Sequence, residues 1–197
     1  MKGYIVNTLD EIAQTFGEEA VQSAVSRFAC PRNLEVETFL NAKAFHSSRL
    51  GTSVTYLVFC ESGGELVGYF TLALKPIEIP VSQLSGKAIR LLKRFSRLDD
   101  KRDSYTVAAY LIAQIGRNFS PDVREKITGD ELLRLAVDRI QVSRRTVGGR
   151  LVFLECEKDR PGLKGFYERN QFAAWSERTD EREGVSYVQM FALLWHE

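Results

Sequence analysis

The sequence has few of the residues that build covalent or metal-held scaffolds. Its 197 residues include three cysteines and two histidines. Cys30, Cys60 and Cys156 lie far apart and form no C-x-x-C pair, which argues against a disulfide framework or a thiolate zinc site and suits a reducing compartment. His46 and His196 are too few and too scattered to predict a catalytic triad or a metal site. We therefore expect no metal.

A long apolar run and an excess of one charge are also lacking. The N-terminal segment MKGYIVNTLDEIAQTF predicts neither a signal peptide nor a membrane span, so we expect a cytoplasmic protein without membrane contact. A net charge of +1 gives no global argument for nucleic-acid or membrane binding. With 44% hydrophobic and 27% charged residues, the composition is typical of a globular protein. We expect a single domain over residues 1–197, large enough to bury a substantial core.

Hydrophobic periodicity predicts helices near the N-terminus and strands at several later places. Residues 3–6 read as a short strand, residues 11–28 as a helix capped by Thr8 or Asp10, and residues 34–49 as a second helix. The later strands are predicted from β-branched and aromatic runs. They are a hairpin of residues 54–60 and 66–74 and a closing antiparallel pair of residues 173–176 and 185–194.

The central part of the chain alternates between strand and helix. Residues 110–117 and 151–156 read as buried strands, and between them an amphipathic helix begins near Gly129. This order, with a hairpin at each end, predicts an α/β fold around a mixed sheet. The first turn of the central helix carries unpaired N–H groups and can hold a phosphate, but a single glycine taken alone favours an ordinary strand–loop–helix connection over a phosphate site.

A basic segment interrupts this pattern at residues 75–105, which we interpret as an insertion. Residues 85–98 predict an amphipathic helix with a stripe of apolar residues and an opposite basic face. The basic face consists of Lys87, Arg90, Lys93, Arg94 and Arg97. Two interpretations stay open: a solvated face on a helix packed against the sheet, and a surface that contacts the phosphates of RNA or another polyanion.

Three segments of the central part occur in a recognisable order: LIAQIGRN, then Arg124-x-x-Ile127-x-Gly129, then GFYERNQF. In this order they resemble the acetyl-CoA-binding core of the GNAT superfamily of N-acetyltransferases. The first is similar to that family's central strand, the second to its Q/R-x-x-G-x-G/A pyrophosphate loop, and the third to its closing FYE-x-x-GF segment. The resemblance implies a mixed, mostly antiparallel sheet flanked by helices on both faces, with splayed central parallel strands.

The resemblance also implies acetyl-CoA as cosubstrate and gives residues roles. The pantetheine arm is expected on the backbone of residues 110–117, and the pyrophosphate on the loop before the helix. The implied cofactor-binding residues are Ile115, Gly116, Arg117, Arg124, Lys126, Ile127, Thr128, Gly129 and Asp130. Backbone N–H groups near Ile115 are expected to polarise the thioester carbonyl, and Tyr167 to protonate the departing thiolate. Taken alone, Tyr167 is better explained as an aromatic residue packed under the sheet edge with its hydroxyl in water, and only the resemblance favours the acid.

The acceptor and the general base are left open by the sequence. Glu65, Glu155 and Glu157 lie on or beside strands, where acidic side chains are usually exposed or paired. The phrases TYLVF and GELVGYFTLAL resemble a GNAT subgroup that includes toxins acetylating aminoacyl-tRNA. A small amine or a protein amine fits the core equally, and a homodimer is compatible with it. The alternative from another class is a non-catalytic binding or regulatory module, which Ile127 supports because the family has a glycine there.

Overall fold

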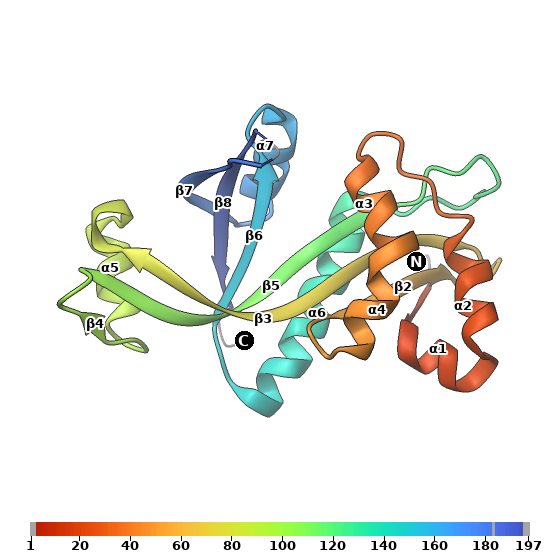
Figure 1. Ribbon diagram of the computed structural model, residues 1–197, viewed down its shortest axis with the longest axis horizontal. Coiled ribbons are helices and arrows are strands. Elements are labelled where there is room, and N and C mark those ends of the chain that lie inside the picture. The colour runs from red at the N-terminus through yellow and green to blue at the C-terminus, as the bar shows by residue number, and fades with distance from the viewer. Residues whose placement is uncertain (1–2, 183, 195–197) are drawn as a thin grey trace. The chain divides into compact units, whose positions relative to one another are not determined.

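The computed structural model describes residues 3–182 and 184–194, which form two compact units (Figure 1). Unit 1 comprises Met1–Ala73 and Ile112–Val142, and unit 2 comprises Leu74–Leu111 and Ser143–Glu197. Two long strands, β3 (Leu66–Pro80) and β5 (Ser104–Arg117), contribute one part to each unit. Each unit is described separately below.

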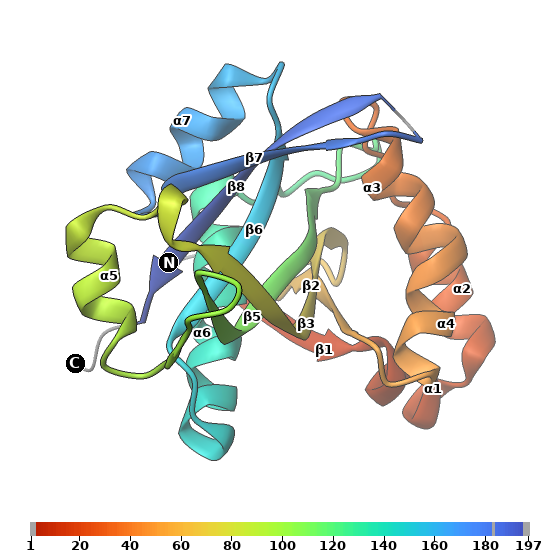
Figure 2. The same cartoon turned by 60° about the vertical axis from the view of Figure 1, so that its left-hand side comes forward.

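Unit 1 is built from antiparallel strands with helices on both faces. Its elements are β1 (Tyr4–Thr8), α1 (Leu9–Phe16), α2 (Glu18–Val25), α3 (Leu34–Thr38), a π-helical turn (Phe39–Lys43), α4 (Ala44–Arg49), β2 (Val54–Cys60), the first part of β3, the last part of β5, and α6 (Gly129–Val147) as far as residue 142. β2 pairs antiparallel with both β1 and β3. Figure 2 shows α1–α4 on one side of these strands and α6 on the other.

The two faces of unit 1 are visible at neighbouring residues of β3. Tyr69 faces α1–α4: its ring meets Phe28 edge-on with centroids 5.1 Å apart, and its hydroxyl donates to the Val36 carbonyl at 2.6 Å. Gly68 faces α6, because a Cβ atom built there would lie 3.2 Å from a methyl group of Leu132. Side chains alternate along a strand, so one strand supplies both halves of the core.

Unit 2 also has helices on both faces of its strands. Its elements are the last part of β3, a 3-10 turn (Val81–Gln83), α5 (Gly86–Leu92), β4 (Leu98–Asp99), the first part of β5, β6 (Leu151–Glu157), α7 (Pro161–Arg169), β7 (Ala173–Asp180) and β8 (Val185–Leu193). Phe153 of β6 belongs to the apolar cluster that contains Leu92 of α5. On the opposite face of β6, Cys156 is buried and lies near Tyr167 of α7.

The strands follow the order β1-β2-β3-β5-β6-β8-β7, with β4 paired to β5. β5 and β6 are parallel, and their pairing covers only Ala109–Leu111 on β5, although β5 continues to Arg117 and β6 to Glu157. β8 pairs antiparallel with both β6 and β7. The predicted mixed α/β sheet, mostly antiparallel with one central parallel pair, is therefore confirmed.

Two predicted helices have wrong bounds. The helix expected over residues 11–28 is two helices, because Gly17 between them adopts a φ of 86° that continues neither helix. The helix expected over residues 85–98 ends at Leu92, where tight-turn bonds from Arg94 N to Leu91 O and from Phe95 N to Leu92 O replace helical ones. None of the described helices is both long and apolar enough to cross a membrane.

Candidate functional site

The loop between β5 and α6, in unit 1, contains four of the nine residues predicted to bind acetyl-CoA; three others end β5 and two begin α6. Its last residue, Thr128, forms a capping box with Glu131. Thr128 N and Oγ1 lie 2.8 and 2.7 Å from the Glu131 carboxylate, and Glu131 N donates to Thr128 Oγ1 at 3.2 Å. The α6 N-terminus, where an anion would be stabilised by the helix dipole, is thus capped by an acidic side chain of the chain itself.

A second carboxylate lies on the same loop. Glu65, from the turn between β2 and β3, accepts from Arg124 N at 3.0 Å and from Glu125 N at 3.4 Å through its Oε2 atom. Together with the capping box, this contact engages backbone donors of Arg124, Glu125 and Thr128. A carboxylate and a phosphate oxygen need the same donors, so a pyrophosphate must displace Glu65 to use this loop fully.

The remaining loop residues divide into a buried anchor and exposed charges. Ile127 is 2% exposed, so its side chain belongs to the core of unit 1. Arg124 and Lys126 are exposed, and neither forms an ion pair with another residue that the structure describes. Asp130 is exposed too and adds a negative charge beside them. The isoleucine in place of glycine thus anchors the loop, and the two cations stay available to an anion.

The end of β5 is held rigidly in unit 1. Gly116 is buried, and a Cβ atom there would lie 2.4 Å from Val36 Cγ1, so the position requires glycine. Arg117 places its guanidinium 5.0 Å from the centroid of the Phe119 ring. Asn118 then ties three segments together: its Nδ2 donates to Leu66 O at 2.8 Å, and its Oδ1 accepts from Ala29 N at 3.0 Å and Ser120 N at 2.9 Å. Ile115, predicted to polarise the carbonyl, is half-buried beside this fixed end.

Sequence reasoning missed Asn118 as the anchor of the strand end, and it considered Glu65 only as a weak candidate base. The sequence signal for Asn118 was its position as an asparagine directly after an apolar strand. For Glu65 no local signal exists, because its partner Arg124 lies 59 residues away.

Tyr167, the predicted acid, lies in unit 2. It is 4% exposed, and its ring packs edge-on against Phe166 and Phe172, with centroids 5.1 and 5.8 Å away. Burial, and to a smaller extent the nearby Cys156, raise the pKa of Tyr167. The hydroxyl therefore keeps its proton at neutral pH, as an acid must. The same burial also fits a purely packing role.

Cys156 and the three acidic candidates are engaged in structural contacts. The Cys156 thiol is buried and lies 3.8 Å from Met190 Sδ, and burial raises its pKa, so it is no nucleophile. Glu155 accepts from Arg178 at 2.7 and 2.5 Å and from Gln189. Burial alone would raise the pKa of Glu155, but these hydrogen bonds outweigh it and lower the pKa.

Glu157 forms an ion pair with Arg160 at 2.7 Å, and Glu65 is held by the loop. All three acidic candidates are therefore paired, and the described residues assign no general base. They also contain no group of three or more histidine, cysteine, aspartate or glutamate residues placed to hold a metal ion.

The basic segment of unit 2 is exposed where its side chains are described. Arg90, Lys93, Arg94 and Arg97 are exposed, and no carboxylate in residues 3–182 or 184–194 forms an ion pair with them. The side chain of Lys87 lies outside the described part of the structure. This cationic cluster has the charge that a polyanion requires.

Comparison with known proteins gives a match in fold. No family model and no curated protein matches the sequence. The structure of AtaT complexed with acetyl-methionyl-tRNAfMet aligns with 94% of this chain and 94% of its own, with a TM-score of 0.63 and 15% identity. A tyrosine-to-phenylalanine mutant of KacT aligns with 94% of each chain, with a TM-score of 0.61 and 15% identity.

A tyrosine-to-phenylalanine mutant of the AtaT toxin, bound to the C-terminus of the antitoxin AtaR and to acetyl-CoA, covers 96% of this chain and 92% of its own, with a TM-score of 0.59 and 14% identity. The chain therefore shares its GNAT-like fold with these proteins.

Proposed function

We propose that the protein is an acetyl-CoA-dependent N-acetyltransferase that transfers the acetyl group directly to a primary amine. The observation that carries the proposal is its GNAT-like fold, shared with an acetyl-CoA-bound toxin over 96% of the chain. The β5–loop–α6 segment adds support, because it has a glycine-dependent strand end, a long helix and two available cations. In the proposed complex, Arg124 and Lys126 bind the pyrophosphate, and the backbone of Ile115 and Arg117 orients the pantetheine arm.

The proposed reaction needs a neutral amine, a polarised carbonyl and a proton donor. The amine nitrogen attacks the thioester carbon, the C–S bond breaks, and the thiolate takes a proton from Tyr167. The new amide nitrogen loses a proton to solvent, and Tyr167 is reprotonated. Tyr167 keeps its proton at neutral pH, as a donor must. Burial also raises its pKa further above that of a thiol, so the transfer to the thiolate is uphill in the free protein and needs a hydrogen bond from the hydroxyl to the developing thiolate.

We propose aminoacyl-tRNA as the acceptor. The exposed cations of Arg90, Lys93, Arg94 and Arg97 support it, and so does the fold shared with AtaT in complex with acetyl-methionyl-tRNAfMet. The amine of an aminoacyl ester is less basic than a lysine side chain, so such an acceptor needs no dedicated base. This agrees with the pairing of Glu65, Glu155 and Glu157. Small amines and protein amines are the competing acceptors.

The second candidate function is a non-catalytic binding module. The observation that favours it is the occupation of the loop donors by Glu65 and Glu131, which opposes a bound pyrophosphate. One assay separates the two functions: release of free CoA thiol from acetyl-CoA, with charged tRNA or with small amines as acceptor. Acceptor-dependent thiol release that falls in Tyr167→Phe supports the transferase. Acetyl-CoA binding without thiol release for any acceptor supports the module.

A further inference from the structure

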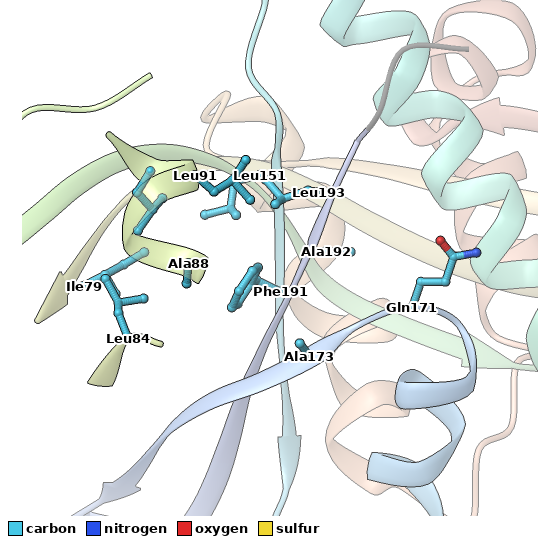
Figure 3. Close-up of a pocket in the computed structure, with 11 residues that line it drawn as sticks. Ile79, Leu84, Ala88, Leu91, Leu151, Gln171, Ala173, Phe191, Ala192 and Leu193 are labelled. Carbon is cyan, nitrogen blue, oxygen red and sulfur yellow. The ribbon is translucent and has the colours of Figure 1, made fainter. Parts of the chain in front are cut away.

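Glu35, at the start of α3 in unit 1, is an exposed carboxylate that contacts the last part of β5. An amine that is partly protonated is bound best by such a group, because a hydrogen bond to a carboxylate is assisted by charge. The apolar pocket of unit 2, about 270 Å³ in volume, offers no equivalent. None of the eleven described side chains that line it is acidic (Figure 3). Recognition of an amine therefore points to Glu35.

The contact of Glu35 lies next to the group proposed to polarise the thioester. Glu35 Oε1 accepts a hydrogen bond from Gln114 Nε2 at 3.3 Å. Gln114 directly precedes Ile115 on β5, so the N–H group proposed to bind the carbonyl belongs to the peptide unit that joins these two residues. Glu35 Oε2 has no hydrogen bond or ion pair with any residue in 3–182 or 184–194. This oxygen is open to a ligand.

The backbone that carries Glu35 is held in place from both sides. The Asn33 side chain caps α3 by accepting from Glu35 N at 3.1 Å and from Val36 N at 3.3 Å. The Val36 carbonyl accepts from the buried Tyr69 hydroxyl at 2.6 Å, and its side chain packs directly over Gly116. The start of α3 is thus fixed against the end of β5, and the carboxylate stays near that strand end without a ligand.

Glu35 lies on the face of β5 that α6 does not cover. Gly116 faces α3, and Gln114, two residues earlier on the strand, faces the same way because side chains alternate. α6, which follows the proposed pyrophosphate loop, lies on the other side of these strands (Figure 2). With the cofactor entering from the side of α6, the amine reaches the thioester carbon from the side of α3. That approach passes Glu35.

We propose that the Glu35 carboxylate binds the α-amine of the aminoacyl-tRNA acceptor, with Gln114 orienting the carboxylate. This inference rests on the proposed function and names the group that recognises its acceptor. The amine donates an N–H bond to Oε2, which turns the nitrogen toward the thioester carbon. The carboxylate also favours an amine over a hydroxyl group, because only the amine carries positive charge. Glu35 takes no proton in this role; the amine loses its proton to solvent.

The first test measures binding without acetyl-CoA. Phenylalanyl-tRNA and phenyllactyl-tRNA differ only in an amine against a hydroxyl group, so the ratio of their Kd values reports the amine contact and cancels the contribution of the phosphates. At slightly acidic pH, wild type should bind phenylalanyl-tRNA about tenfold more tightly, because its amine makes a charge-assisted hydrogen bond. In Glu35→Gln the two Kd values should lie within about twofold of each other.

Glu37→Gln is the matched control. Glu37 lies one residue beyond Val36 on α3, and its carboxylate accepts from Cys30 N at 2.6 Å, a hydrogen bond that glutamine can keep. This variant loses the same charge from the same helix, yet its preference for phenylalanyl-tRNA should stay within about twofold of the wild-type preference. In acetyl transfer, Glu35→Gln should lower kcat/KM for phenylalanyl-tRNA at least about tenfold and leave the Kd for acetyl-CoA within about twofold.

Three results would overturn the proposal: no binding of phenylalanyl-tRNA by the folded wild-type protein, equal Kd values of wild type for the two tRNAs, or an unchanged preference in Glu35→Gln. The two proposals fail separately. If wild type releases no CoA thiol but its preference for the amine is lost in Glu35→Gln, the transferase is refuted and the amine contact stands. If thiol release occurs and Glu35→Gln keeps the preference, the transferase stands and Glu35 does not bind the acceptor.

Discussion

Replacing Glu65 with glutamine should tighten acetyl-CoA binding, although Glu65 stabilises the free protein. The carboxylate of Glu65 accepts hydrogen bonds from Arg124 N and Glu125 N, which lie on the loop proposed to bind the pyrophosphate. The pyrophosphate must displace this carboxylate and is also repelled by it. The Glu65→Gln substitution removes the charge and keeps the shape of the side chain.

The magnitude follows from two contributions. Hydrogen bonds to a charged group contribute about 1.5–3 kcal/mol, roughly twice the value for neutral partners, so glutamine is easier to displace by about 1 kcal/mol. Removing the repulsion between two charges about 4 Å apart adds about 1 kcal/mol at the dielectric constant of water. A gain of about 2 kcal/mol lowers the Kd for acetyl-CoA about 30-fold. The free variant should lose about 1 kcal/mol of stability, or about 2–4 °C in Tm.

Isothermal titration with acetyl-CoA at low salt measures this gain. Glu61→Gln is the matched control, because Glu61 is exposed on the same β2–β3 turn and has no hydrogen bond to the loop. Its Kd should stay within about twofold of wild type, since the charge is more screened there. Equal or weaker binding by Glu65→Gln, with Glu61→Gln unchanged, would refute the role assigned to Glu65.

Four further predictions concern single side chains. Tyr167→Phe should lower kcat about 100-fold and leave the Kd for acetyl-CoA within about twofold of wild type. Because burial raises the pKa of Tyr167, the kcat of wild type should not fall through ionisation of this group up to about pH 10. Gly116→Ala should lower stability by about 1–3 kcal/mol in thermal denaturation, because its Cβ would lie 2.4 Å from Val36 Cγ1. Arg178→Ala should lower the free energy of unfolding above pH 4.5, the ordinary pKa of Glu155. Wild type should lose this stability as the pH falls through the lowered pKa of Glu155, and the variant should show a smaller loss. Arg94→Glu should weaken tRNA binding and reduce the slope of log K against log salt by about 1.

Controls separate these effects from general damage. Gly162→Ala should change stability by less than about 0.5 kcal/mol, because no atom lies within 4 Å of a Cβ built there. Arg145→Glu, which reverses an exposed charge on α6, should leave tRNA binding nearly unchanged. If Arg145→Glu and Arg94→Glu weaken tRNA binding equally, the basic segment has no specific role. If Tyr167→Phe has the kcat of wild type, the Tyr167 hydroxyl has no catalytic role and the side chain serves only in packing.

The strands and the long central helix could be predicted because local patterns decide them. The β-branched runs of β2 and β6 and the apolar stripe of α6 at Leu132, Ala136 and Ile140 are visible in the sequence, and the structure buries that stripe. Breaks inside helical patterns were harder. Gly17 divides α1 from α2, and Leu98 leaves the apolar stripe of α5 to pair with Tyr105 in a short strand. Tertiary pairing overrode periodicity there.

The candidate site was predictable only in part. The position of the loop could be predicted from the order of strand, loop and helix. The capping box could be predicted too, because Thr128 and Glu131 are only three residues apart. The contact of Glu65 with the loop joins residues 59 positions apart, so no local pattern contains it. The role of Ile127 could not be predicted either. An isoleucine in this loop can obstruct a bound pyrophosphate or anchor the loop in the core, and only its burial in the structure, at 2% exposure, shows that it anchors the loop.

The most direct test of the proposed function is a thiol-release assay with acetyl-CoA and charged tRNA, run in parallel on wild type, Glu65→Gln and Tyr167→Phe. We predict release of CoA thiol that depends on charged tRNA, with Glu65→Gln saturating at lower acetyl-CoA and Tyr167→Phe nearly inactive. No thiol release and no acetyl-CoA binding by either wild type or Glu65→Gln would contradict the account, because the loop would then not be a pyrophosphate site.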